Sequence, residues 1–140
     1  MRIAGIGYQR RSLDEVVGAL HASGIEVLID VREVPWSRRA EFAKKPLAER
    51  LARESIRYVH LPSAGNPRAI RRSGAPSAEV LARYREHVAR HPSVLDQILA
   101  AAGGAPAALL CYERDVAACH RSVLLEALAA RDPELRVDAL

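Results

Sequence analysis

The sequence predicts one three-layer α/β/α domain with a mostly parallel sheet of about five strands. Three observations lead to this fold class. The 140 residues have the usual length of a single domain, so residues 1–140 are expected to form one unit. Short apolar stretches alternate with stretches of helical periodicity along the chain. The run 25–31 is apolar apart from Glu26 and Asp30, as in a strand covered on both faces.

The composition is that of an ordinary globular protein, with 49% apolar and 27% charged residues. Aromatic residues make up only 4%, so the core must rest on aliphatic side chains. No apolar run approaches the ~20 residues of a membrane span, and we expect no membrane partner. The first residues lead directly into a strand-like stretch without a secretory apolar region, which predicts a cytoplasmic protein and leaves its oligomeric state open.

The first helix is the best-marked element of the N-terminal half. Residues 2–7 are expected to form a strand, and Ser12 then begins a helix, because Ser12 and Glu15 have the spacing of a capping box. Gly24 ends that helix, and the run 25–31 forms the second strand.

A polar loop and a second helix follow. Residues 32–45 are rich in Arg and Lys and predict a loop. Pro46 suits the first helical position, so a helix is expected from there to about Glu54. A short third strand, 57–61, leads into residues 62–76, whose Gly and Pro content predicts a long loop. Loops of this length often serve in binding or closure.

The C-terminal half continues the alternation. Ser77 is expected to cap a helix that reaches Arg90, and Pro92 and Ser93 begin another that ends at the glycine pair 103–104. The remaining elements are, in order, a strand at 107–111, a helix at 121–130 and a strand at 135–139.

Polar residues follow four of the predicted strands at the point where each strand ends. They are Gly7, Tyr8, Asp30, Arg32, His60, Cys111 and Glu113. Ligands of open parallel sheets bind outside the carboxyl ends of the strands, so these residues predict a pocket at that edge. Two alternatives stay open here: His60 is a hydrogen-bonded structural residue, or Asp30 and Arg32 pair only with each other.

The stretch 111–122 has the highest density of chemically useful side chains. It returns Cys119, His120 and Arg121 to the start of a helix, where unpaired N–H groups favour anions and thiolates. A structural disulfide with Cys111 is not expected in a reducing cytoplasm. Three interpretations remain: a reactive thiol, a metal site, or buried cysteines that serve packing.

Glu113 lies two residues beyond Cys111 and is a candidate general base or an anchor for an arginine. The alternative is a carboxylate on the surface. The spacing of the two cysteines matches no common structural zinc pattern, and we predict no resident metal on that basis.

The net charge is +4, and arginine supplies most of the positive charge. An arginine-biased genome explains such a composition, but so does an anionic ligand, because the guanidinium fork matches phosphate and carboxylate. Arg32, Arg38 and Arg121 are the candidates for holding such an anion.

A series of short segments, spread over nearly the whole chain, matches the signature of a known family. They are Ile6–Tyr8, Ser12–Leu13, Ile29–Arg32, Pro35, Ser37–Arg38, Phe42, Tyr58–Pro62, Gly65, Cys111–Glu113 and Cys119–Arg121. With these segments the chain resembles the bacterial and archaeal family catalogued as domain of unknown function 488.

The resemblance implies a compact α/β domain with its signature residues gathered at one edge. It implies that Ser37 is a candidate substrate-binding residue, in addition to Arg38. It implies no established activity and no cofactor. Many members of the family carry His where this chain has Tyr8, so an acid–base role at that position is not implied here.

A weaker, local likeness concerns rhodanese-type sulfurtransferases. The segment Leu28–Arg32 is similar to an early strand of those enzymes, and a strand that ends in a cysteine is similar too. However, those enzymes wrap an anion in a tight loop directly after the cysteine. Here Ala117, not an arginine, lies six residues beyond Cys111, and no glycine lies between that cysteine and the helix. Rhodanese activity is therefore a minor alternative.

Three function classes fit these observations. The first is a hydrolase or transferase that acts on a nucleotide or phosphorylated metabolite, with Cys111, Glu113, Cys119 and His120 as catalytic candidates. The second is a nucleic-acid-binding module that uses Trp36, Tyr8 and basic loop residues, which are Arg10, Arg11, Arg38, Arg39, Lys44, Lys45, Arg68, Arg71 and Arg72. The third is a non-catalytic interaction protein in which the cysteine segment serves packing.

Overall fold

The computed structural model describes residues 1–115 and 119–140, which form a five-stranded sheet of order β3-β2-β4-β1-β5. All neighbouring strands are parallel, which confirms the prediction of a mostly parallel sheet. The strands are β1 (Arg2–Gly7), β2 (Val27–Asp30), β3 (Arg57–His60), β4 (Ala107–Cys111) and β5 (Arg136–Ala139).

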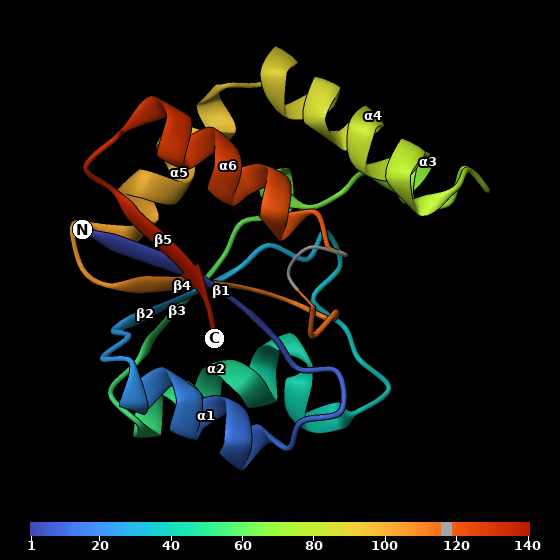
Figure 1. Ribbon diagram of the computed structural model, residues 1–140. Coiled ribbons are helices and arrows are strands. Elements are labelled where there is room, and N and C mark those ends of the chain that lie inside the picture. Colours follow the sequence, from blue (N-terminus) through green and yellow to red (C-terminus); the bar gives the residue numbers. More distant parts are fainter. Residues whose placement is uncertain (116–118) are drawn as a thin grey trace.

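Helices cover both faces of the sheet, which gives the expected three-layer α/β/α architecture (Figure 1). One layer consists of α1 (Leu13–Ala22) and α2 (Lys44–Arg53). The other contains α3 (Arg68–Arg71), α4 (Ser77–Arg90), α5 (Ser93–Ala102) and α6 (Arg121–Arg131). The chain steps from β1 through β2 to β3 in one direction and then returns through β4 to β5. Right-handed crossovers therefore place the two sets of helices on opposite faces.

The core has two halves, one on each face of the sheet. Successive residues of a strand point to opposite faces, so Ile29 and Leu109 pack in the half that contains α4–α6. Leu28 and Leu110 pack in the half beneath, with α1 and α2. Because both faces are covered, the central strands read as continuous apolar runs rather than alternating ones.

Local signals predict most element boundaries. Glu15 N donates to Ser12 Oγ and Ser12 N donates to a Glu15 carboxylate oxygen, both at 3.0 Å, so the capping box forms as expected. Gly103 ends α5 in the left-handed conformation, with φ of 60°, where a residue with a Cβ would be strained.

Three local predictions need correction. Helix α2 begins at Lys44 rather than Pro46, because the first helical N–H groups need no partner and a proline is tolerated within the first turn. Ser77 is the first helical residue of α4, and Pro76 occupies the capping position without a side-chain hydrogen bond. The loop 62–76 contains a 3₁₀ turn at Pro62–Ala64 and the short helix α3.

The strand order creates a switch point around β4. Strand β4 lies between β1 and β2; α1 and α2, which follow β1 and β2, cover one face of the sheet, whereas α6, which follows β4, covers the other. A crevice forms outside the carboxyl ends at such a point. Within the described residues, no helix combines the length and the apolar character that crossing a bilayer requires.

Gly7 ends β1 directly beneath the backbone of the segment that follows β4. A Cβ added at this position would lie 1.8 Å from the carbonyl oxygen of Glu113 and 2.9 Å from Cα of Arg114. These neighbours are backbone atoms and cannot rotate away. The glycine therefore allows the β1 and β4 segments to lie in contact at the edge of the crevice.

Gly7→Ala is expected to lower the free energy of unfolding by about 2 kcal/mol or more, since the added methyl overpacks rigid backbone. Gly18→Ala is the matched control, because nothing lies within 4 Å of its added Cβ and helical alanine gains up to ~1 kcal/mol. Denaturant unfolding of both variants measures the difference. Equal midpoints would contradict the close approach at Gly7.

Candidate functional site

A pocket of about 450 Å³ lies at the carboxyl ends of β1, β2 and β4. Six of the residues predicted from the sequence line it together, and they are Tyr8, Arg32, Cys111, Glu113, Cys119 and His120. These residues come from three strand ends and from the segment before α6. The structure thus gathers in one hollow groups that are up to 112 positions apart in the chain.

Other predicted residues lie around the pocket without lining it. Gly7 supports the segment after β4, as described above. His60 Nε2 donates to the Arg32 carbonyl oxygen at 2.8 Å, so this histidine braces the segment after β2. Ser37 Oγ accepts from the backbone N–H of Arg39 at 3.1 Å, and Arg38 is exposed outside the pocket.

A buried ion pair fixes the end of β2. Asp30 has no exposed surface, and its carboxylate accepts from Arg32 Nε at 2.9 Å and Nη2 at 2.7 Å. Tyr58 Oη donates to the same carboxylate at 2.5 Å. The third guanidinium nitrogen, Arg32 Nη1, donates to the Phe42 carbonyl at 2.8 Å and to Tyr8 Oη at 3.3 Å. These contacts occupy the whole carboxylate and most of the guanidinium.

The protonation states of Arg32 and Tyr58 follow from their contacts with the Asp30 carboxylate. Burial alone would lower the pKa of Arg32, but the hydrogen bonds and the charge of Asp30 raise that pKa above its ordinary value. Burial and the Asp30 carboxylate together raise the pKa of Tyr58. At neutral pH the Tyr58 phenol is therefore neutral and donates its hydrogen to the ion pair of Asp30 and Arg32.

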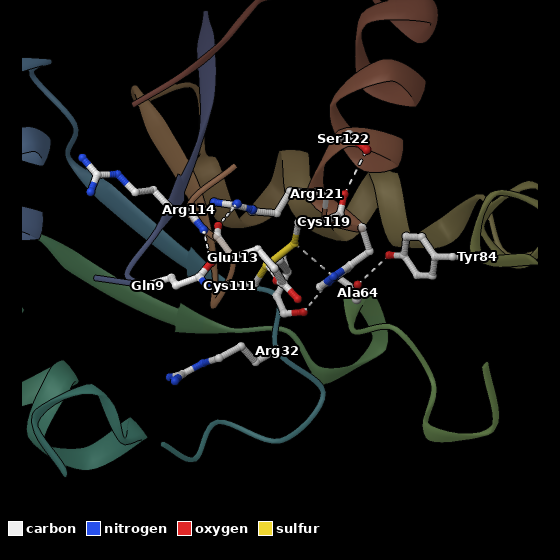
Figure 2. Close-up of a disulfide and its surroundings, with 12 residues drawn as sticks. Gln9, Arg32, Ala64, Tyr84, Cys111, Glu113, Arg114, Cys119, Arg121 and Ser122 are labelled. Carbon is white, nitrogen blue, oxygen red and sulfur yellow. Dashed lines mark hydrogen bonds between the residues drawn. A yellow bond between two sulfur atoms is a disulfide. The ribbon is translucent and has the colours of Figure 1, made fainter. Parts of the chain in front are cut away.

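A disulfide joins Cys111 and Cys119 in the wall of the pocket (Figure 2). This bond differs from the expectation of two free thiols. The fold explains it, because β4 and the start of α6 bring the sulfurs together although eight positions separate the residues. The predicted return segment between them includes residues 116–118, which lie outside the described residues.

Each sulfur of the pair has a proton acceptor beside it. Glu113 Oε2 lies 3.2 Å from Cys111 Sγ. His120 Nδ1 lies 3.5 Å from Cys119 Sγ. When the disulfide is reduced, each thiol therefore has a hydrogen-bond acceptor beside it.

The orientation of His120 follows from its second nitrogen. Nε2 lies 2.9 Å from the Val31 carbonyl oxygen, which can only accept, so Nε2 carries the hydrogen and Nδ1 keeps its lone pair. Tyr84 packs edge-on against the imidazole, with ring centroids 5.1 Å apart. Burial, assisted by the charges of Arg121 and Arg71, lowers the pKa of His120 to about 4, so the ring is neutral at physiological pH.

Arg121 lies beneath the site rather than in it. Its side chain is fully buried, and Nη2 donates to the Glu113 carbonyl oxygen, as Figure 2 shows. Nε and Nη1 are buried without a hydrogen-bond partner among the described residues. Burial lowers the pKa of Arg121 to about 10, which still leaves a positive charge beside the Glu113 backbone at neutral pH.

The sequence was compared with known protein families and with proteins of known structure. The family described as Domain of unknown function DUF488 matches residues 12–128. The chain belongs to this family. No curated protein and no solved structure gives a significant match. The matched range of the DUF488 family spans the pocket residues from Arg32 to His120 and excludes Tyr8.

Sequence reasoning missed several lining residues of this DUF488 domain. Glu33, Asn66 and Tyr112 line the pocket but occur in loops without periodicity. Trp36 and Arg71, weighed above for nucleic-acid contacts, line it too. The only available signal was the length of the loop 62–76, which places Asn66 and Arg71 at the pocket but does not say which of its residues matter.

Exposed apolar side chains gather at the rim of the pocket. Val34, Trp36 and Tyr112 are three of the four large apolar side chains exposed among the described residues, and all three line the pocket. Trp36 is 64% exposed and Tyr112 is 49% exposed. Exposed apolar groups that cluster around a hollow mark a binding surface.

Asp30→Asn is expected to lower the free energy of unfolding by about 3 kcal/mol, because it leaves the Arg32 guanidinium buried without its counter-ion. Glu79→Gln is the control, since it breaks an exposed i,i+4 pair with Arg83 that contributes only about 0.3–0.5 kcal/mol. Thermal or denaturant unfolding compares the two variants. A cost for Asp30→Asn as small as that of the control would show that the buried pair holds nothing in place.

Proposed function

We propose that the protein is an enzyme that binds a small anionic substrate of the nucleotide class in this pocket and transforms it at the Cys111–Cys119–His120 cluster. The observation that carries the proposal is that the pocket places this cluster and Glu113 within reach of one ligand. The reaction class that fits is hydrolysis or group transfer, with thiolate and acid–base groups at the centre.

Arginines at the mouth support an anionic substrate. Arg71 lines the pocket and is held by a half-exposed pair with Glu33, whose atoms lie 2.9 Å apart. Such a surface pair contributes little to stability, so Arg71 Nη2 can exchange the carboxylate for a phosphate while Nε keeps its 3.2 Å hydrogen bond to the Asn66 carbonyl. An adjoining hollow of about 420 Å³ shares Arg71 with the pocket and adds Arg68 and Arg72. The adjoining hollow therefore carries three guanidinium groups.

The aromatic rim supports a planar portion in that substrate. Trp36 lines both the pocket and the adjoining hollow. An exposed indole offers a stacking face that any nucleobase can use. An anionic group near Arg71 and a base against Trp36 would place the rest of a nucleotide over the cysteines.

Fluorescence provides a direct binding test, because Trp36 is the only tryptophan in the chain. Nucleoside mono-, di- and triphosphates are expected to change its emission saturably. Arg71→Gln should weaken that binding by roughly 10-fold or more, as expected for losing a charged hydrogen bond. Arg83→Gln is the matched control, because Arg83 is also in a surface ion pair but lies outside the pocket. Equal weakening by both variants would contradict a specific anion site.

Turnover separates binding from chemistry. Nucleotides that bind are incubated with the reduced protein, and products are separated by chromatography. Cys119→Ala and Glu113→Ala are expected to slow conversion by roughly 100-fold or more while melting temperature and Trp36 emission changes remain nearly as before. If no nucleotide binds, or if both variants retain full conversion, the proposed function is wrong.

A nucleic-acid-binding function is the second candidate, and the adjoining hollow favours it. Arg68, Arg71 and Arg72 stand on or beside the exposed helix α3, next to Trp36. Oligonucleotides that bind tighter than the mononucleotide in proportion to their length, with affinity that falls steeply with salt, would favour this candidate. Affinity that is independent of length favours the enzyme.

A further inference from the structure

We propose that the reduced chain binds one Zn²⁺ through Cys111 Sγ, Cys119 Sγ and His120 Nδ1, with the fourth coordination position open to the pocket. Among the described residues this is the one group of three metal-ligating side chains whose donor atoms lie within 4.8 Å of one another. Thiolate and imidazole are the ligands that zinc sites use most. The inference rests on the proposed function for the use of the metal, but metal binding itself can be tested alone.

The histidine is already oriented as a ligand. Metal-bound histidines almost always donate their other ring N–H to a carbonyl or carboxylate, which fixes the tautomer and the ring plane. His120 has this arrangement before any metal arrives, because Nε2–H donates to the Val31 carbonyl at 2.9 Å. Its free Nδ1 lies 3.5 Å from Cys119 Sγ. A tetrahedral zinc ion with bonds of about 2.0–2.3 Å holds neighbouring donors at about that separation.

The backbone spacing of the cysteines also suits a metal between them. Their Cα atoms are 7.7 Å apart, whereas disulfides usually join Cα atoms about 4.4–6.8 Å apart. An ion between the two sulfurs uses this wider spacing without bringing the strand end and the start of α6 closer together.

Charge balance favours a divalent cation at this position. Two thiolates and the Glu113 carboxylate, 3.2 Å from Cys111 Sγ, carry three negative charges. The buried guanidinium of Arg121 compensates one of them. A divalent ion compensates the other two, so the cluster with zinc is neutral as a whole, which matters where burial penalises net charge.

The number of ligands indicates a catalytic rather than a structural site. Structural zinc sites use four protein ligands, whereas catalytic ones use three and leave a position for water or substrate. Cys111, Cys119 and His120 all line the pocket, so the fourth position can be reached from it. A zinc ion there would polarise a phosphoryl or carbonyl oxygen, or a bound water, next to the proposed substrate.

The disulfide and the metal exclude each other, which gives the site two forms. Reduction by a thiol or phosphine reductant adds two electrons and two protons and converts the S–S bond to two S–H groups. Zinc binding then releases both thiol protons to solvent and forms two S–Zn bonds, with His120 Nδ1 as the third ligand. A small-molecule disulfide reverses the change by thiol–disulfide exchange: it takes two electrons from the two thiolates, leaves as two thiols, and the zinc ion is released.

Cobalt titration tests the site, because Co²⁺ replaces Zn²⁺ in tetrahedral sites and reports thiolate ligands by a charge-transfer absorption band. Untagged protein, reduced with a phosphine and freed of excess reductant, is expected to bind one Co²⁺ per chain with this band. One equivalent of Zn²⁺ should bleach the band. Protein in the disulfide form should show neither the charge-transfer band nor Co²⁺ binding.

Variants assign the ligands. Cys111→Ser, Cys119→Ser and His120→Gln are each expected to weaken Co²⁺ binding by ~100-fold or more, whereas His91→Gln, which changes an exposed histidine, should leave it unchanged. Circular dichroism confirms that each variant is folded. If His120→Gln does not fold, the two serine variants decide, since they change one atom each.

The outcomes separate this inference from the proposed function. No thiolate band in reduced protein, or binding that survives both serine variants, overturns the zinc site. Nucleotide binding and conversion that persist in a chelator would then leave the proposed function standing with thiol chemistry alone. Cobalt binding without any nucleotide effect on Trp36 would support the zinc site and contradict the proposed function.

Discussion

The geometry of the whole site depends on the short segment that leaves β2. The buried pair of Asp30 and Arg32 fixes its course, and two carbonyl groups of the same segment serve as anchors. The Val31 carbonyl accepts from His120, and the Arg32 carbonyl accepts from His60. A displacement of this segment would therefore move the imidazole away from Cys119. Burying an ion pair costs desolvation, and Asp30 and Arg32 offset that cost with two direct hydrogen bonds to each other and further bonds to Tyr58 and the Phe42 carbonyl.

The strand order of the sheet brings the segment after β2 next to the segments after β1 and β4, and together they form the pocket. Strand β4 lies between β1 and β2, so the segment after β4 meets Tyr8 on one side and Arg32 on the other. Gly7 lets the two segments touch, because no side chain separates them. Arg121 then fastens the segment from below through the Glu113 carbonyl. The cysteines thus lie in a pocket wall that is held by the end of β1, the segment after β2 and the start of α6. The apolar side chains around Trp36 at the rim remain exposed.

Much of the fold follows from local sequence signals. The capping box at Ser12, the glycine at 103 and the apolar runs of the strands each act through neighbouring residues, so short windows suffice to recognise them. Local sequence signals were weaker in two places. At the start of α2 a proline is tolerated inside the first turn and so does not mark its first residue. Within 62–76 the Gly and Pro content indicates a loop and hides the 3₁₀ turn and the short helix α3. The reactive residue types could also be listed from the sequence, because Cys119, His120 and Arg121 are adjacent.

By itself, the sequence determined the fold class, the order of strands and helices along the chain, and the edge of the sheet at which the candidate residues collect. These follow from periodicity and from the rule that parallel strands present their carboxyl ends together. Only the tertiary structure decided the roles at that edge. It buried Asp30 in an ion pair, aligned His120 on a carbonyl 89 positions away, and joined Cys111 to Cys119. Those outcomes depend on distances between residues far apart in the chain, and sequence spacing carries no information about such distances.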